Sequence, residues 1–313
     1  MIEKVNIRHQ DKICDLIADS THAYLYNLDS GSYCSIDVTY NSGSYQVVGQ
    51  IDLSEVVDKT LLKVNLVESL RPLGIEETIK NINLDLNQFS SSSLYNLNNN
   101  LAVDNCVSTG YACREHPSYL PYEVQFTAEL ISFVPPTHRY KSICSLKGNE
   151  LSIDFTTNYT GSNNLVEFHK TYCEQFSLVT GSCTITTSSF DDEELQYSNG
   201  MSGVKLHSDL YGSKVGTPSG PLSGRDIHQI DKVSTFYARK LARDYMLSNT
   251  GSQEVFFEMA YKKGKEQPLY VKKIEDGIET YISGSDFSVN TMVSELNKST
   301  FVSDNYITPL LFI

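Results

Sequence analysis

The sequence predicts an α+β fold in which mainly antiparallel sheets are covered on one face by helices. Two segments carry apolar side chains at steps of three to four residues, which is typical of helices, and several others alternate between polar and apolar side chains, which is typical of strands. Two of the alternating runs, Tyr33–Tyr40 and Gln46–Leu53, flank the sequence Asn41-Ser42-Gly43-Ser44 and so indicate a β-hairpin. Hairpins followed by helices favour antiparallel sheets with one covered face.

Helices are predicted where an apolar period begins after a polar start. The first follows His9–Lys12, and its apolar stripe consists of Ile13, Leu16, Ile17, Tyr24 and Leu25. A later helix follows Ser223-Gly224-Arg225-Asp226, and its stripe consists of Ile227, Ile230, Val233, Tyr237 and Leu241. Further helices are expected from about Ser54 to Leu70, around 165–177 and around 286–298.

The remaining strands are predicted from alternation alone. They are expected at Glu150–Tyr159, Ser182–Ser188, Glu254–Tyr261 and Pro268–Ile274. The stretch Asn87–Asn100 is rich in Ser and Asn, which predicts a mobile loop. The residues themselves contain no strict internal repeat.

The composition restricts the classes of partner. The 313 residues include 40% apolar and 20% charged side chains, which is ordinary for a folded chain with one large or two to three small units. The formal net charge of −13 disfavours a broad basic face, so neither nucleic acid nor an anionic membrane is an expected partner. If the substrate is a polyanion, the positive charges that bind it must be concentrated inside a site.

The location expected from the sequence is cytoplasmic. No run of about 18 apolar residues occurs, and the first residues are polar, which predicts neither a membrane span nor a signal peptide. The seven cysteines are an odd number and form no Cys-x-x-Cys pair, which indicates reduced thiols and argues against a zinc site.

Three segments contain candidate functional residues. At the start of the first helix, free N–H groups would suit a phosphate, and Asp11 could hold Mg²⁺ together with phosphate oxygens, although a polar helix start is also ordinary capping. Residues 216–226 form a Gly- and Ser-rich stretch before the later helix, which could cradle a phosphate or be a plain surface loop; it lacks the Gly-Lys-Ser/Thr ending of a Walker loop. The third segment, residues 101–112, contains Asp104.

In this order and spacing, the three segments resemble the S-adenosylmethionine synthetase (methionine adenosyltransferase) family. The first resembles the family's Gly-His-Pro-Asp-Lys-Ile motif, and the second and third resemble its glycine loop and its Gly-Ala-Gly-Asp motif. The resemblance covers about residues 1–300. The residues kept are His9, Asp11, Lys12, Ile13, Asp104, Gly110, Tyr111, Ala112, Asp209, Tyr211, Gly212, Gly220, Ser223, Gly224, Asp226, Asp231, Tyr237, Ala238 and Arg239.

The resemblance implies a fold, a reaction and a subunit arrangement. The fold is a single unit of three similar, interleaved α+β subdomains around a pseudo-threefold axis, at approximately 1–10 with 115–215, 11–114, and 216–313. In the reaction, the sulfur of L-methionine attacks C5′ of ATP and expels triphosphate, which is then cleaved to pyrophosphate and phosphate. The sites lie between two subunits, so a homodimer or higher homo-oligomer is expected.

The resemblance also implies site roles. Its implied catalytic residues, around the leaving triphosphate, are His9, Lys141, Lys205 and Arg225, the last in place of a Lys. Its implied metal ligands are Asp11 and Asp231 for two Mg²⁺ ions, and Asp37 in place of a Glu that usually binds K⁺. Its implied substrate-binding residues are Phe190 beside the adenine and, on the methionine side, Asp104, Gln50, Ser198 and Gln229.

Several departures from the family pattern leave two functions open. Gln50 replaces a Glu, Ser198 an Asp, Gln229 a Lys and Val204 an Arg, while Arg8, Gln10, Pro218 and Pro221 alter the loops. The retained phosphate side favours an active methionine adenosyltransferase, with altered acceptor preference as one variant. The altered methionine side favours a catalytically impaired paralogue that pairs with an intact synthetase and regulates it.

Overall fold

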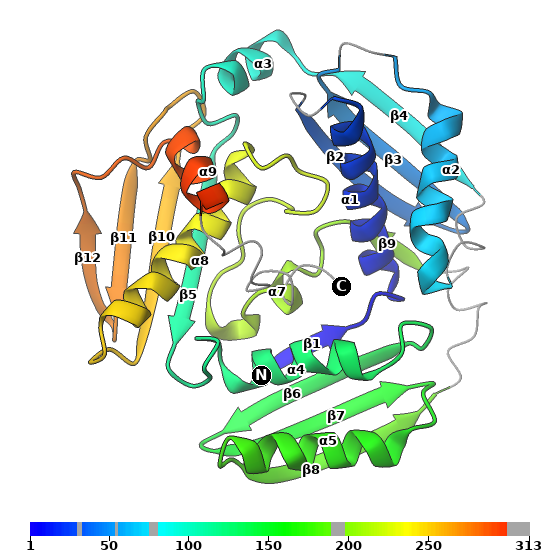
Figure 1. The fold of residues 1–313 in the computed structure, drawn as a ribbon, viewed down its shortest axis with the longest axis vertical. Coiled ribbons are helices and arrows are strands. Elements are labelled where there is room, and N and C mark those ends of the chain that lie inside the picture. The colour runs from blue at the N-terminus through cyan, green and yellow to red at the C-terminus, as the bar shows by residue number, and fades with distance from the viewer. Residues whose placement is uncertain (30–32, 54–55, 75–80, 189–197, 299–313) are drawn as a thin grey trace.

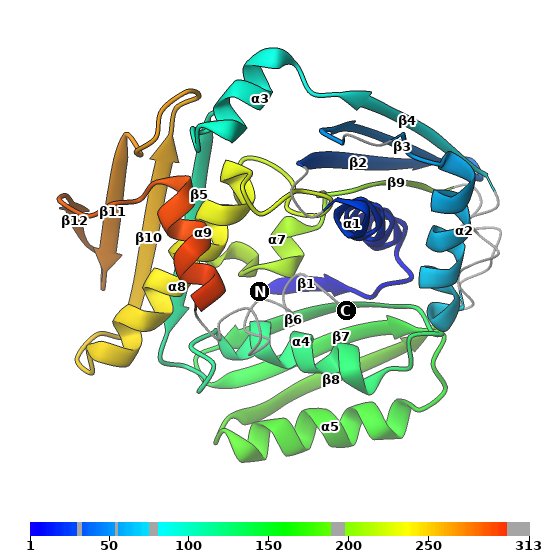
Figure 2. The ribbon, with the colours of Figure 1, turned by 45° about the horizontal axis from the view of Figure 1, so that its top comes forward.

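The fold consists of three four-stranded sheets arranged around a common centre (Figure 1). The computed structural model describes residues 1–29, 33–53, 56–74, 81–188 and 198–298. Two helices accompany each sheet, and the second view shows the three sheets from a different side (Figure 2). The predicted α+β class with mainly antiparallel sheets is confirmed.

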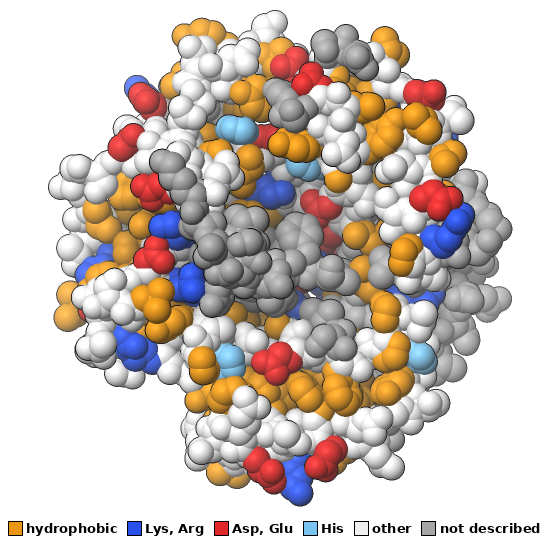
Figure 3. Space-filling view, in the orientation of Figure 1, with side chains coloured by type: hydrophobic (Ala, Val, Ile, Leu, Met, Phe, Trp, Pro, Cys, Tyr) orange, Lys and Arg blue, Asp and Glu red, His pale blue; other side chains and the backbone are white. Residues whose placement is uncertain are grey.

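The first unit contains the order β1-β6-β7-β8. Its strands are β1 (Ile2–Val5), β6 (Tyr140–Lys147), β7 (Glu150–Thr157) and β8 (Val179–Thr187). Its helices are α4 (Tyr122–Phe133) and α5 (Ser162–Gln175), which contact β6 and β8. On the face seen in Figure 3, hydrophobic side chains gather in a band over this unit.

The second unit contains the order β4-β3-β2-β9. Its strands are β2 (Cys34–Asn41), β3 (Ser44–Ile51), β4 (Ile82–Gln88) and β9 (Asn199–Met201). The predicted hairpin is the β2–β3 pair. Helix α1 (Gln10–Leu28) packs on β2 and β9, α2 (Lys59–Leu70) packs beside α1, and the short η1 (Arg71–Leu73) follows α2.

The third unit contains the order β12-β11-β10-β5. Its strands are β5 (Cys106–Cys113), β10 (Glu254–Tyr261), β11 (Tyr270–Glu275) and β12 (Ile278–Ile282). Helix α8 (Ile230–Ser248) packs on β5 and β10, and α9 (Val289–Lys298) packs on α8. Three short helices lie outside the units: α3 (Ser91–Asn98), α7 (Leu206–Asp209) and η3 (Gly212–Lys214).

The three units repeat one arrangement. In each, a helix precedes a hairpin (α4 before β6–β7, α1 before β2–β3 and α8 before β10–β11), and the first hairpin strand also pairs with a strand from a distant part of the chain. These distant strands are β1, β9 and β5. Among the described strands, the parallel pairs are β3–β4 and β7–β8, because α2 and α5 each supply the crossover that a parallel connection needs.

Two strands pair in a different sheet from the one that the predicted subdomain boundaries suggest. The sequence boundaries group residues 106–113 with the second subdomain and residues 199–201 with the first. In the structure, β5 pairs with β10 in the third sheet and β9 pairs with β2 in the second. The exact boundaries of the subdomains stay a proposal.

The prediction of a loop at Asn87–Asn100 is wrong for most of its length. Residues 91–98 form α3, and Ser90 is its N-cap, since the Ser90 side chain accepts a hydrogen bond from the backbone N–H of Ser93 at 3.2 Å. Serine is a weak helix former in a helix interior but a strong N-cap, so a Ser-rich stretch can begin a helix. Leu97 anchors this helix, because its side chain is buried.

Two apolar cores hold the units. One core is shared by the first and third units, and the other is confined to the second unit. Gly110 on β5 allows the closest approach in the first core, because a Cβ at this position would overlap the backbone of Ala238 and Arg239 on α8. All seven cysteines are free thiols.

Charge is mixed on the surface seen in Figure 3. Among the described residues of this face, Lys and Arg side chains (blue) are interspersed with Asp and Glu side chains (red), and no broad basic area is present. Within the part of the chain that the structure describes, no helix combines the length and apolar character needed to cross a bilayer.

Candidate functional site

Several of the predicted site residues lie in two groups at different positions along α1. The first group surrounds the start of α1 and includes His9, Asp11 and Lys205. The second group surrounds the loop before α8, which Asp19 of α1 holds by accepting the N–H of Gly224 at 2.8 Å. Asp11 and Asp19 are eight positions apart, so the groups are separated by roughly 12 Å along the helix.

His9 is the N-cap of α1 and the centre of the first group. Its Nδ1 accepts a hydrogen bond from the backbone N–H of Asp11 at 3.2 Å, so the proton of the neutral ring is on Nε2. Burial and the nearby cations Lys205, Lys141 and Arg139 lower the pKa of His9 from 6.5 to about 3. The imidazole is therefore neutral at physiological pH, and its 3.6 Å approach to the Asp11 carboxylate is not an ion pair.

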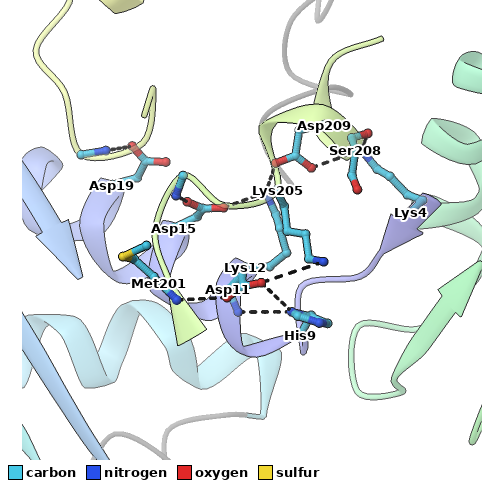
Figure 4. A network of polar contacts seen from close by, with 12 residues as sticks. Lys4, His9, Asp11, Lys12, Asp15, Asp19, Met201, Lys205, Ser208 and Asp209 are labelled. Atoms are coloured by element: carbon cyan, nitrogen blue, oxygen red, sulfur yellow. Dashed lines mark hydrogen bonds and ion pairs between the residues drawn. The ribbon is translucent and has the colours of Figure 1, made fainter. Parts of the chain in front are cut away.

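Asp11 faces His9 and Lys205 with one carboxylate oxygen (Figure 4). Its Oδ1 accepts the backbone N–H of Met201 on β9 at 3.0 Å, which fixes the carboxylate. Its Oδ2 lies 4.0 Å from Nζ of Lys205, whose ammonium also contacts Glu3 at 3.3 Å. One oxygen is thus used for structure, and the other faces the neutral His9 ring and the Lys205 ammonium.

A buried charge network supports the first group. Nζ of Lys12 lies 2.7 Å from Asp209 on α7 and 3.2 Å from Asp15, and Nζ of Lys4 lies 3.4 Å from Asp209. Burial by itself would lower the pKa of Lys12, but Asp209 and Asp15 outweigh burial and raise this pKa above its usual value. The network joins β1, α1 and α7, and so holds the start of α1 in place (Figure 4).

Sequence reasoning did not assign roles to three members of this network. The predicted site residues do not include Lys4, Asp15 or Asp209, yet the side chains of these three residues are buried around Lys12. Asp209 could have been found, because it belongs to a retained motif; Lys4 and Asp15 carry no comparable signal.

The second group begins with Arg225. Its Nη2 donates to Oδ1 of Asp37 on β2 at 2.7 Å, and its Nη1 donates to the backbone oxygen of Ile36 at 2.6 Å. Gly224 lies in the left-handed region with φ 69°, and a Cβ there would overlap the carbonyl of Ile36. Glycine at this position therefore allows the loop to reach β2.

Asp231, in the first turn of α8, lies near Asp104. Oγ of Ser219 donates to Oδ1 of Asp231 at 3.0 Å. Burial raises the pKa of Asp231, the Asp104 carboxylate raises it further, and hydrogen bonds from Cys106 and Ser219 oppose the change. A cation bound between the two neighbouring carboxylates would relieve their repulsion and favour the ionised form of Asp231.

The methionine-side residues are less well placed. The side chain of Gln229 is only 8% exposed, and its amide donates to the carbonyl of Cys34 at 2.7 Å, so this side chain holds the loop to β2. Gln50 is exposed on β3, and Ser198 directly precedes β9. On the phosphate side, Val204 is 49% exposed. Phe190 lies outside the described residues.

The residues present fit magnesium held jointly with phosphate. Mg²⁺ usually takes one or two carboxylates and completes its shell with water and substrate phosphate oxygens. Asp11 has an oxygen directed toward the Lys205 ammonium, and Asp231 has a pKa raised by burial and by Asp104. Among the described residues, no cluster of three or more His, Cys, Asp or Glu could form an all-protein cage.

Sequence and structure comparisons agree on one family. The S-adenosylmethionine synthetase C-terminal domain matches residues 194–302. S-adenosylmethionine synthases of Mycoplasma capricolum and Prochlorococcus marinus are 22% and 20% identical, over 94% and 97% of this chain and 87% and 83% of their own lengths. An unusual S-adenosylmethionine synthetase from Campylobacter jejuni has a similar fold, with a TM-score of 0.68 at 15% identity, over 98% of this chain and 87% of that one.

Proposed function

The chain is a divergent member of the S-adenosylmethionine synthetase family, and from this premise we propose that it is a cytoplasmic methionine adenosyltransferase. Its substrates are ATP and L-methionine. The methionine sulfur forms a bond to C5′ of ATP, and the bond from C5′ to the triphosphate oxygen breaks. The products are S-adenosylmethionine and triphosphate, which is then hydrolysed to pyrophosphate and phosphate.

The observation that carries the proposal is the neutral His9 among lysines. The substrate supplies its own nucleophile, so the protein must position the sulfur and stabilise the charge on the leaving triphosphate. His9 keeps its proton on Nε2 and can donate it as a hydrogen bond to the leaving oxygen, while Lys205 and Lys141 supply positive charge. Burial together with these lysines keeps His9 neutral, so the same cations contribute to both effects.

Magnesium would be held by Asp11 in the first group and Asp231 in the second. Bound there with phosphate oxygens, two Mg²⁺ ions would neutralise negative charge on the triphosphate. The protein's own part is to fix the carboxylates, through the N–H of Met201 for Asp11 and the hydroxyl of Ser219 for Asp231.

A complete site requires two copies of the chain. The two groups are separated along α1, so the second group of one subunit would complete the first group of its partner. Exposed apolar side chains on strands of all three sheets support a homodimer through the sheet faces. They include Val48, Val107, Ile143, Val179 and Met201.

The test is a direct assay of the products. Purified protein is incubated with ATP, Mg²⁺ and L-methionine, and S-adenosylmethionine, pyrophosphate and phosphate are quantified. Formation of all three, dependent on methionine, supports the proposal. Folded protein that forms none of them, under conditions where an intact synthetase is active, contradicts it.

A second candidate function rests on the methionine side. The buried Gln229 amide is committed to the Cys34 carbonyl and stands in place of a lysine of the family pattern, so this side lacks that cation. A chain that binds triphosphate but not methionine could pair with an intact synthetase and regulate it. Mixing the two proteins and measuring both subunit exchange and the rate of the intact enzyme distinguishes this function from the first.

A further inference from the structure

We propose that the guanidinium of Arg225 takes the position of the monovalent cation that the family places beside Asp37, so that this chain does not use potassium there. The proposal rests on the family membership stated above. The residues present do not fit a potassium ion, because Oδ1 of Asp37 accepts from Nη2 of Arg225 at 2.7 Å and the neighbouring carbonyl of Ile36 accepts from Nη1 at 2.6 Å. The planar guanidinium of Arg225 thus donates hydrogen bonds to both the Asp37 carboxylate and the Ile36 carbonyl.

Other oxygens of this region also accept hydrogen bonds from side-chain nitrogens. Nζ of Lys232 donates to the carbonyl of Arg225 at 2.8 Å, and Nε2 of Gln229 donates to the carbonyl of Cys34 at 2.7 Å. A potassium ion needs several such oxygens to replace its hydration shell. In this region, a potassium ion would have to displace protein donors and approach the side chains of Arg225 and Lys232, which repel it.

The pairing of Arg225 is fixed by the fold. The loop is attached to β2 by the backbone N–H of Ile36, which donates to the carbonyl of Gly224 at 2.8 Å, and to α1 by the Gly224–Asp19 hydrogen bond. The Arg225 side chain is only 11% exposed, while that of Asp37 is 45% exposed. Since a guanidinium remains protonated at every accessible pH, this cation does not exchange with solvent.

The first experiment measures the melting temperature of the unmodified protein in KCl, NaCl and tetramethylammonium chloride at one ionic strength. A ligand that binds the folded state raises the melting temperature in a saturable way. We expect the three salts to agree within about 1 °C, and ²⁰⁵Tl⁺ NMR to show no saturable bound signal. A saturable potassium-specific rise, or a bound Tl⁺ signal that K⁺ displaces, overturns the proposal.

The second experiment removes the built-in cation. Arg225→Met keeps the apolar stem but frees the Asp37 carboxylate, so this variant should gain a saturable rise in melting temperature with K⁺. Adding Asp37→Asn should abolish the rise. Lys240→Met is the matched control, because Lys240 pairs with Asp244 on the surface of α8, and it should show no gain. An Arg225→Met variant that folds and does not respond to K⁺ contradicts the proposal.

Asp37→Asn alone gives an answer even if the Arg225 variant does not fold. If Asp37 pairs with Arg225, the loss of stability should be equal in K⁺ and in tetramethylammonium. If Asp37 holds potassium, the loss should occur in K⁺ only, which would overturn the proposal. All of these readouts report ion binding and stability, so their outcome is independent of whether the protein forms S-adenosylmethionine.

Discussion

At the scale of single residues, the protonation of His9 links the site to stability. Its pKa is about 3 in the folded chain and about 6.5 in the unfolded chain, so the unfolded state binds more protons between these values. The stabilising effect of the neutral form is fully present above about pH 6.5 and is lost as the pH falls toward 3.

His9→Gln should remove this pH dependence, because glutamine can cap α1 but does not titrate. Between about pH 6 and pH 5, we expect the unmodified protein to lose about 1 kcal/mol more unfolding free energy than the variant. Urea unfolding at both pH values measures the difference. Parallel losses in the two proteins would mean that His9 does not titrate below its ordinary range in the folded state.

Restoring charge at Val204 is the simplest repair of the site. Val204 is half exposed, so an arginine fits there without repacking, and it would stand next to Lys205 on the phosphate side. Val204→Arg should increase S-adenosylmethionine formation about tenfold, which is about 1.4 kcal/mol of transition-state stabilisation. Val166→Arg, at an exposed valine of α5, is the control and should change nothing.

Repair at the methionine side should be less effective. Gln229 is buried and bonded to the Cys34 carbonyl, so the new ammonium of Gln229→Lys would be held by the same carbonyl. In combination with Val204→Arg, we expect Gln229→Lys to increase the activity by a smaller factor than the arginine does. Ser198→Asp should increase the activity by more than Gln229→Lys, because Ser198 is partly exposed. A larger gain from Gln229→Lys would show that the loop rearranges when substrate binds.

At the scale of secondary-structure elements, the β5–α8 contact places the second group. Gly110 lies against the backbone of α8, whose first turn carries Asp231. Gly110→Ala should lower the unfolding free energy by about 3 kcal/mol, because strand and helix must separate. Gly251→Ala is the matched control, with no atom within 4 Å of the added Cβ, and urea unfolding of both variants measures the difference. Equal stability of the two variants would contradict this packing.

The elements that the sequence predicted are those with a strong local period. Glu254–Tyr261 is β10 as predicted, and the hairpin of β2 and β3 follows its turn sequence. Strand β5 was not predicted, because its sequence Cys-Val-Ser-Thr-Gly-Tyr-Ala-Cys mixes small residues that pack against α8 and gives no clear alternation. Its place is set by the tertiary contact with α8 and β10, and local propensity does not report such contacts.

At the scale of the whole molecule, some residues of the candidate site could be predicted from local motifs and others could not. The N-cap at His9 and the carboxylates Asp11 and Asp231 could be selected from motifs. The pair of Asp37 with Arg225 joins residues far apart in the sequence, and the buried Lys12–Asp209 pair does the same. Such pairs depend on how the three units meet, which a local pattern does not contain.

The arrangement of the units leads to a test by complementation between subunits. If each site combines the first group of one subunit with the second group of its partner, His9→Ala and Asp231→Asn are each inactive as homodimers. Co-expressed in equal amounts, they should form half mixed dimers with one intact site in each. We therefore expect about one quarter of the unmodified activity.

The control is a pair of variants in the same group. In a mixed dimer of His9→Ala with Lys205→Ala, every first group carries one defect, so no intact site forms and the activity should stay at the level of the single variants. Recovery is measured as S-adenosylmethionine formed per dimer, with light scattering to confirm that dimers are present. No recovery in either pair, despite an active unmodified protein, would place the two groups in one subunit's site and contradict the shared arrangement. Recovery in the control pair would show that His9 and Lys205 serve different sites, which contradicts the first group.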